Sequence, residues 1–176
     1  VLRATLDGHS AAVRALACGP SGDLISGSED GMVKVWRDGV CALTCARRSL
    51  TSQPAWIRAV AVSPLDGSIV SGSQSATATV WNGSTGEHMV TLKGHATYVL
   101  AVCVLANGDV VTASHDMTVR VWQRGSWACT AVHAQPSHAC ALLPLPTGGF
   151  AVGGGPVFDT GFVSVWRDGA CEWNLA

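Results

Sequence analysis

Four tryptophans recur at a nearly constant spacing, and this repeat constrains the fold more than any other feature of the chain. Each ends a short alternation of β-branched residues, and the four are Trp36, Trp81, Trp122 and Trp166. They are 45, 41 and 44 residues apart. A period of about 40–45 residues fits a four-stranded β-sheet unit and is too long for ankyrin or leucine-rich repeats. The sequence therefore predicts four successive units of one kind.

The residues between the tryptophans also correspond from unit to unit. In the first unit an apolar alternation at 13–18 precedes a turn at 20–23 and a strand of small residues at 24–28. A tight turn leads to the tryptophan strand, and a glycine-containing turn leads on to a fourth strand. No helical periodicity competes with this pattern, which predicts an all-β chain of four-stranded antiparallel blades, that is, part of a β-propeller. The approximate repeats are 1–40, 41–85, 86–126 and 127–176.

Two of the four units carry a complete histidine–aspartate–tryptophan signature with identical spacings. The signatures are Gly8-His9, Asp30 and Trp36 in the first unit, and Gly94-His95, Asp116 and Trp122 in the third. With these residues the chain resembles the WD-repeat family of β-propellers over essentially its whole length. The resemblance implies hydrogen-bonded tetrads, in which aspartate binds histidine, histidine binds a Ser or Thr hydroxyl, and the hydroxyl binds the indole. Such a network satisfies polar groups that burial of the tryptophan would otherwise leave unpaired.

The hydroxyl of each tetrad stays open between two positions, which are Ser26 or Ser28 in the first unit and Thr112 or Ser114 in the third. The second unit has no Gly-His pair before Trp56, and Ser75 stands where the turn aspartate is expected. The fourth unit also lacks the pair in register, and its tight turn is stretched over 155–161. The resemblance therefore does not extend the tetrad to these two units.

The number of repeats predicts an incomplete ring. The WD-repeat resemblance implies seven or eight blades, and this chain supplies about four. Residues 2–6 and 171–175 both read as outer strands, one more than four blades need. Open blade faces and unpaired edges favour association. We expect either part of a longer propeller or a protomer whose ring another chain completes, and the first is favoured.

Composition excludes several classes of function. Eleven Lys and Arg balance twelve Asp and Glu, for a formal charge of −1, so no general attraction to nucleic acid is expected. No apolar run approaches the length of about 20 residues that spans a bilayer. The seven cysteines form no CxxC pair, and they are typical of free thiols in a reducing, cytoplasmic protein.

Candidate catalytic and metal sites are weak. His133, His138 and Cys140 do not have the spacing of a zinc site, and Asp116 beside His115 already has a role in the tetrad. The glycines at 153–155 have no following Lys-Ser or Lys-Thr and no helix, as a phosphate-binding loop requires. The sequence therefore predicts no metal, no cofactor and no enzymatic activity.

The loops ahead of the innermost strands are better candidates. One equivalent position holds Ala12, Trp56, Tyr98 and His138 in the four units. Further candidate contacts are Arg14 and Arg58 in the innermost strands, and Glu29, Gln74 and His115 before the tight turns. Exposed Trp and Tyr are enriched in binding hot spots. The alternatives are that Trp56 is a buried cap and that the arginines are solvated strand ends.

These features predict a scaffold that docks a peptide or protein partner on its loop face. The strings at 103–111 and 166–171 resemble a phospholipase-activating, ubiquitin-binding branch of the family, which implies ubiquitin or a ubiquitin-pathway component as partner. Two alternatives stay open: a structural subunit of a cytoskeletal or ciliary assembly, and the targeting propeller of a multidomain enzyme.

Overall fold

Sixteen β-strands account for the regular structure of the described residues. The structure is a computed structural model that describes residues 5–46, 55–155 and 161–175. The strands are β1 (Val13–Cys18), β2 (Leu24–Ser28), β3 (Val33–Arg37), β4 (Val40–Cys45), β5 (Ile57–Val62), β6 (Ile69–Ser73), β7 (Thr77–Trp81), β8 (His88–Lys93), β9 (Val99–Val104), β10 (Val110–Ser114), β11 (Thr118–Trp122), β12 (Cys129–Ala134), β13 (Ala139–Pro144), β14 (Phe150–Gly154), β15 (Phe162–Arg167) and β16 (Ala170–Leu175).

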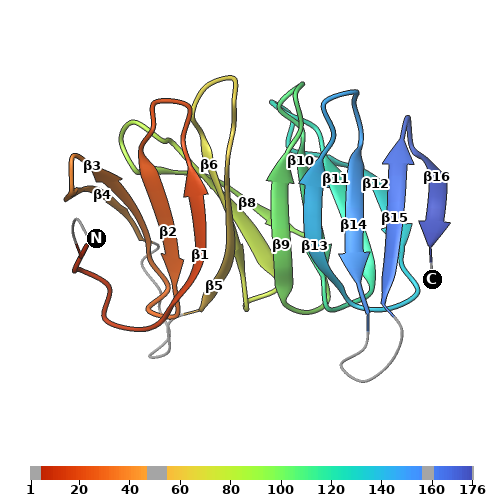
Figure 1. Ribbon diagram of the computed structural model, residues 1–176, viewed down its shortest axis with the longest axis horizontal. Helices are drawn as coiled ribbons and strands as arrows, with labels where there is room; N and C mark the ends of the chain where they lie inside the picture. The colour runs from red at the N-terminus through yellow and green to blue at the C-terminus, as the bar shows by residue number, and fades with distance from the viewer. Residues whose placement is uncertain (1–4, 47–54, 156–160, 176) are drawn as a thin grey trace.

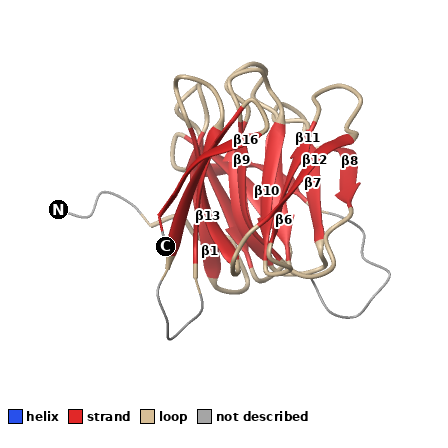
Figure 2. Cartoon of the chain, turned by 90° about the vertical axis from the view of Figure 1, so that its right-hand side faces the viewer, coloured by secondary structure: helices blue, strands red, loops and turns tan. Residues whose placement is uncertain are grey.

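The strands form four antiparallel sheets, each a simple meander of four consecutive strands. The orders are β1-β2-β3-β4, β5-β6-β7-β8, β9-β10-β11-β12 and β13-β14-β15-β16. Figure 2 shows strands and loops alone in the described chain. The prediction of four-stranded antiparallel propeller blades is confirmed. Within the described residues there is accordingly no helix of the length and apolarity that a membrane crossing requires.

The blades are out of phase with the predicted repeats. β4, β8 and β12 each belong to the blade of the three strands before them, although most of their residues fall in the following repeat. An outer strand was predicted at 2–6. Thr5 and Leu6, the described residues of that range, lie outside any strand, and residues 1–4 lie outside the described chain. Each blade is therefore complete with its own four strands.

Consecutive blades pack face to face through apolar side chains. Ile25, Val33 and Val35 of the first blade pack against Ile57 and Trp81 of the second. The second and third blades repeat this arrangement around Trp122, and the third and fourth repeat it around Trp166. Each of these tryptophans thus lies against the preceding blade, and its strand is held by the hydrophobic effect across the interface.

The blade stack ends in two uncovered faces. In Figure 1 the first and last blades lie at opposite ends of the molecule. Val33 of the first blade is fully buried, whereas Val163, which has the same register position in the last blade, is 47% exposed. Trp173 on β16 is 64% exposed. The last blade therefore presents the apolar face that each earlier blade covers with its successor.

The first blade is open on its other side. Val13 is 48% exposed, although its equivalent Val99 in the third blade is fully buried. A shallow pocket on this face is lined by Leu6, Val13, Leu16 and Trp36. The exposed residues of the two end blades therefore occupy positions that face a neighbouring blade elsewhere in the stack.

Close packing at the blade interfaces gives a matched pair of glycine substitutions. A Cβ on Gly72 would lie 2.8 Å from Val99 Cγ1 and 3.0 Å from Val102 Cγ1, whereas a Cβ on Gly153 would meet only Ala141 Cβ at 3.5 Å. We expect Gly72→Ala to lower the free energy of unfolding by about 1–3 kcal/mol, because a β-branched neighbour must move. Gly153→Ala should be neutral or slightly stabilising, because it restricts the unfolded chain.

Urea denaturation of both variants of the 176-residue chain measures this difference. Equal losses of stability would show that the face of the last blade is as tightly covered as the interface between the second and third blades.

Candidate functional site

The first blade contains a continuous network from tryptophan to aspartate. Trp36 Nε1 donates a hydrogen bond to Ser26 Oγ at 2.8 Å, and Ser26 Oγ lies 2.7 Å from His9 Nε2. His9 Nδ1 lies 2.8 Å from Asp30 Oδ2. The hydroxyl is therefore that of Ser26. Ser28 Oγ instead donates to the Ala11 carbonyl and accepts from the Asp30 amide.

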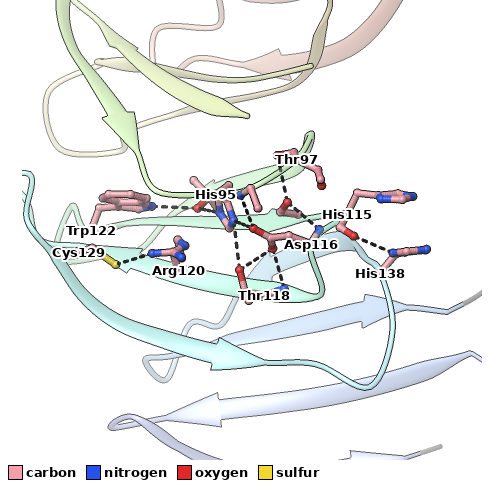
Figure 3. A network of polar contacts seen from close by, with 12 residues as sticks. His95, Thr97, His115, Asp116, Thr118, Arg120, Trp122, Cys129 and His138 are labelled. Carbon is pink, nitrogen blue, oxygen red and sulfur yellow. Dashed lines mark hydrogen bonds and ion pairs between the residues drawn. The ribbon is translucent and has the colours of Figure 1, made fainter. Parts of the chain in front are cut away.

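The third blade repeats this network (Figure 3). Trp122 Nε1 donates to Thr112 Oγ1 at 2.9 Å, Thr112 Oγ1 lies 2.7 Å from His95 Nε2, and His95 Nδ1 lies 2.9 Å from Asp116 Oδ2. Thr118 Oγ1 adds a hydrogen bond to Asp116 Oδ1. The hydroxyl is that of Thr112, because Ser114 Oγ instead donates to the Thr97 carbonyl and accepts from the Asp116 amide.

Electrostatics favours a neutral histidine and an ionised aspartate in this network. Burial lowers the pKa of His95 below its usual 6.5, against the raising effect of Asp116. Burial alone raises the pKa of Asp116, but hydrogen bonds from Thr118, the Ala96 amide and His95 outweigh it and lower that pKa to about 2. His95 Nδ1–H can then donate a hydrogen bond to the carboxylate, while His95 Nε2 accepts one from the Thr112 hydroxyl. Each of these groups in the network therefore has a hydrogen-bond partner.

The second blade keeps only the end of the network nearest the tryptophan. Trp81 Nε1 donates to Ser71 Oγ at 2.8 Å. Ser75, at the position of the turn aspartate, lies 3.0 Å from the hydroxyls of Ser73 and Thr77. A short hydroxyl network on the surface therefore stands where the first and third blades have a histidine–aspartate hydrogen bond.

The fourth blade satisfies its tryptophan from a different strand. Val152 occupies the position of Ser26 and Thr112, and its cross-strand partner Ser164 supplies the hydroxyl instead. Trp166 Nε1 lies 3.0 Å from Ser164 Oγ, which donates to Gln135 Oε1 at 3.0 Å. The sequence analysis missed this substitute. The signal was available, because Ser164 two residues before Trp166 is the one polar residue of that alternation.

The four positions predicted to be equivalent ahead of the innermost strands make the same backbone contact. The carbonyls of Ala12, Trp56, Tyr98 and His138 each accept a hydrogen bond from the amide that follows the second strand of their blade, at 2.9 to 3.2 Å. These amides belong to Glu29, Gln74, His115 and Gly155. The candidate contact residues therefore lie at the end of each blade where its innermost strand begins, which is the lower edge of Figure 1.

Five candidate residues from three blades form a continuous line of side chains, here called the loop-face row: Trp56, Arg58, Tyr98, His115 and His138. The guanidinium carbon of Arg58 lies 5.4 Å from the Trp56 ring centroid and 5.7 Å from that of Tyr98. Tyr98 and His115 have ring centroids 6.1 Å apart, and His115 stacks on His138 at 3.7 Å. His138 Nδ1 also lies 2.9 Å from the His115 carbonyl oxygen (Figure 3).

The row is accessible along its length. Tyr98 is 40% exposed and His115 is exposed, while Trp56, Arg58 and His138 are half-buried. Trp56 is therefore neither fully buried as a cap nor free in solvent.

The remaining candidates belong to the first blade. Arg14 Nε donates to Glu29 Oε1 at 2.7 Å, and this exposed ion pair lies at the same register as Arg58 and Gln74 in the second blade. Arg14 is thus an exposed strand residue whose charge is already balanced.

The loose histidine–cysteine cluster is divided between different neighbours. His133 packs on Trp166 with ring centroids 4.1 Å apart, His138 stacks on His115, and Cys140 Sγ lies 3.7 Å from the Gly153 carbonyl oxygen. Across residues 5–46, 55–155 and 161–175, no three His, Cys, Asp or Glu side chains gather as metal ligands would. All seven cysteines are free thiols.

The tetrad geometry generates a comparison between equivalent turn positions. Asp30→Ala removes the carboxylate that binds His9 and the amides of Ser10 and Met32. We expect it to lower the free energy of unfolding by about 1.5–3 kcal/mol, since hydrogen bonds to a charged group are lost. Ser75→Ala should change stability by no more than about 0.5 kcal/mol, because Ser75 is exposed.

Thermal and urea denaturation of the two variants provide the measurement. If both substitutions cost the same, the histidine–aspartate hydrogen bond of the first blade has no stabilising role that the hydroxyl network of the second lacks.

Comparisons with known proteins agree with this architecture. Residues 1–37, 44–82 and 86–123 match the family model described as WD domain, G-beta repeat. The DENN domain and WD repeat-containing protein SCD1 of Arabidopsis thaliana is 34% identical over 148 residues, which are 81% of this chain and 12% of that protein. Nuclear distribution protein nudF of Emericella nidulans is 27% identical over 170 residues, which cover 82% of this chain and 37% of that protein.

A solved structure shows the same fold. The structure of U3-55K superposes with a TM-score of 0.84 at 21% identity, over 94% of this chain and 52% of that one. The chain thus spans about half of this solved structure and a smaller share of both relatives. These comparisons do not show the resemblance to phospholipase-activating, ubiquitin-binding proteins. From its matched repeats and its blades, the chain belongs to the WD40-repeat family of β-propellers.

Proposed function

We propose that this chain docks a peptide or protein segment on the loop-face row. WD40-repeat proteins generally act as protein-interaction scaffolds, and the row is the feature that suggests where a partner binds here. The observation that carries the proposal is the unbroken contact from Trp56 through Arg58 and Tyr98 to His115 and His138. Three blades contribute to one surface, which suits an extended partner.

The chemistry of the row supports binding. Tyr, Trp and Arg are enriched at interface hot spots because they bury large areas and still offer polar groups. Each of these side chains starts at, or next to, a strand whose inner residues are buried, such as Ile57 and Val99. A partner would therefore meet side chains on a rigid base, and little conformational entropy would be lost on binding.

The test compares partners bound by the full-length protein and by three variants. Trp56→Ala and Tyr98→Ala should each weaken a partner held on the row by about tenfold or more, the range of interface hot spots. Met89→Ala is the matched control, because Met89 is an exposed apolar residue of the outer strand β8, in a blade that has a neighbour on both sides. Quantitative affinity purification finds the partner, and titration of the purified partner gives the affinities. Melting curves establish that the variants remain folded.

The outcomes separate this proposal from its alternatives. In a structural subunit that uses its edges and outer strands, Met89→Ala would release the partner while Trp56→Ala and Tyr98→Ala would not. Purified ubiquitin is titrated as a defined probe, because the strings at 103–111 and 166–171 suggested a ubiquitin-pathway partner. A targeting propeller of a multidomain enzyme would also dock partners on this row, with catalysis carried by another domain.

We propose a non-enzymatic, cytoplasmic role for the residues described, supported by the interaction scaffold and by seven free thiols.

We also propose that further blades of a longer propeller cover the two open faces. The last blade exposes Val163 where the first blade buries Val33, and the chain spans only 52% of the solved propeller chain that it matches. Light scattering after size exclusion tests this on the 176-residue chain. We expect the 18.1 kDa monomer with a tendency to aggregate through its uncovered faces. A stable species of twice that mass would show instead that a second copy completes the ring.

A further inference from the structure

Two arginines occupy the same position in consecutive blades and differ in their surroundings. Arg14 follows Val13, which pairs with Ser28, and Arg58 follows Ile57, which pairs with Ser73. The next residue after each of these serines bonds to the carbonyl ahead of the innermost strand, and it is Glu29 in the first blade and Gln74 in the second.

This substitution removes the counter-ion of Arg58. Glu29 binds the Arg14 guanidinium, with Arg14 Nε donating at 2.7 Å. Gln74 is neutral, and no carboxylate among the described residues lies within ion-pair distance of Arg58. Nε of Arg58 is also buried without a hydrogen-bond partner in the described part of the chain. Among the described residues, the second blade therefore holds a cation that has no carboxylate partner and has one unpaired N–H donor.

The neighbours of Arg58 suit it to bind an anion. Its guanidinium carbon lies 5.4 Å from the Trp56 ring centroid and 5.7 Å from that of Tyr98, so the cation is held between two aromatic side chains. Aromatic neighbours exclude water and lower the local dielectric constant, which strengthens attraction to a negative charge. A planar guanidinium also matches a carboxylate with two parallel hydrogen bonds.

We propose that Arg58 binds a carboxylate side chain, Glu or Asp, of an acidic segment in the protein partner. This carboxylate takes the place that Glu29 occupies beside Arg14. The inference rests on the proposed function, since it names the chemistry of the partner that docks on the loop-face row. Trp56 and Tyr98 contribute apolar contact on either side of the charge, and His115 and His138 extend the surface over which the peptide continues.

The blade-to-blade comparison supplies an unusually direct test. Gln74→Glu gives Arg58 the internal carboxylate that Arg14 already has, and should therefore compete with an acidic partner. Arg58→Gln removes the cation and keeps hydrogen-bonding capacity. We expect each change to weaken binding of an acidic peptide by about tenfold or more. Arg124→Gln is the matched control, because Arg124 forms an exposed ion pair with Asp66 away from the row.

The probes are peptides selected from a random-peptide phage library on the full-length protein. Selected peptides are synthesised with a fluorescent label, and their affinities are measured by anisotropy for each variant, together with versions in which Glu and Asp become Gln and Asn. The inference predicts enrichment of acidic residues, lower affinity of the neutral versions, and loss of affinity with Arg58→Gln and Gln74→Glu. Raising the salt concentration should also weaken binding.

Two results overturn the inference in different ways. Peptides that lose affinity with Trp56→Ala and Tyr98→Ala but are indifferent to Arg58→Gln would refute the carboxylate site and leave the docking surface standing. Peptides that are indifferent to Trp56→Ala and Tyr98→Ala as well would refute both the site and the proposed function. Both Arg58→Gln and Gln74→Glu alter side chains at the surface end of the blade, and melting curves check that the fold is retained.

Discussion

Burial of one tryptophan per blade is the interaction on which the structure depends, and in the second, third and fourth blades the ring lies against the preceding blade. The indole ring supplies a large apolar surface, and its N–H must still find an acceptor once it is removed from water. Trp36, Trp81 and Trp122 find it on the adjacent strand, in the hydroxyls of Ser26, Ser71 and Thr112. Packing of successive blades then builds a rigid base for the loops.

The four blades meet the same requirement with different residues. Two extend the network through histidine to a buried aspartate, and the second stops at the hydroxyl of Ser71. In the fourth, Ser164 acts from the tryptophan strand and is itself supported by Gln135. The part common to all four blades is therefore an acceptor for the indole, and the histidine–aspartate hydrogen bond is an added stabilisation. This tolerance explains how a blade without a Gly-His pair retains the same four-stranded sheet.

Much of the candidate site was predictable because it follows from strand periodicity. Aligning the units from their turns placed Trp56, Tyr98 and His138 at one position, and the shared backbone hydrogen bonds show why that alignment works. What the alignment could not supply was contact between units. The stacking of His115 on His138 and the position of Arg58 between two rings depend on the angle between blades. The substitute acceptor Ser164 did not follow from the repeat pattern, because that pattern places the hydroxyl on the neighbouring strand and Ser164 lies on the tryptophan strand itself.

The sequence by itself determined that the chain is all-β, that its unit is a four-stranded blade, and that two blades carry aspartate–histidine pairs. These features are local or periodic, since alternation, turn residues and a fixed tryptophan spacing each act within one repeat. Only the tertiary structure decided which strand completes each blade, which hydroxyl of each candidate pair binds the indole, and which arginine lacks a counter-ion. It also decided which apolar faces stay uncovered. Those properties depend on contacts between side chains that lie far apart in the sequence. Packing of strands and blades decides which of these side chains meet.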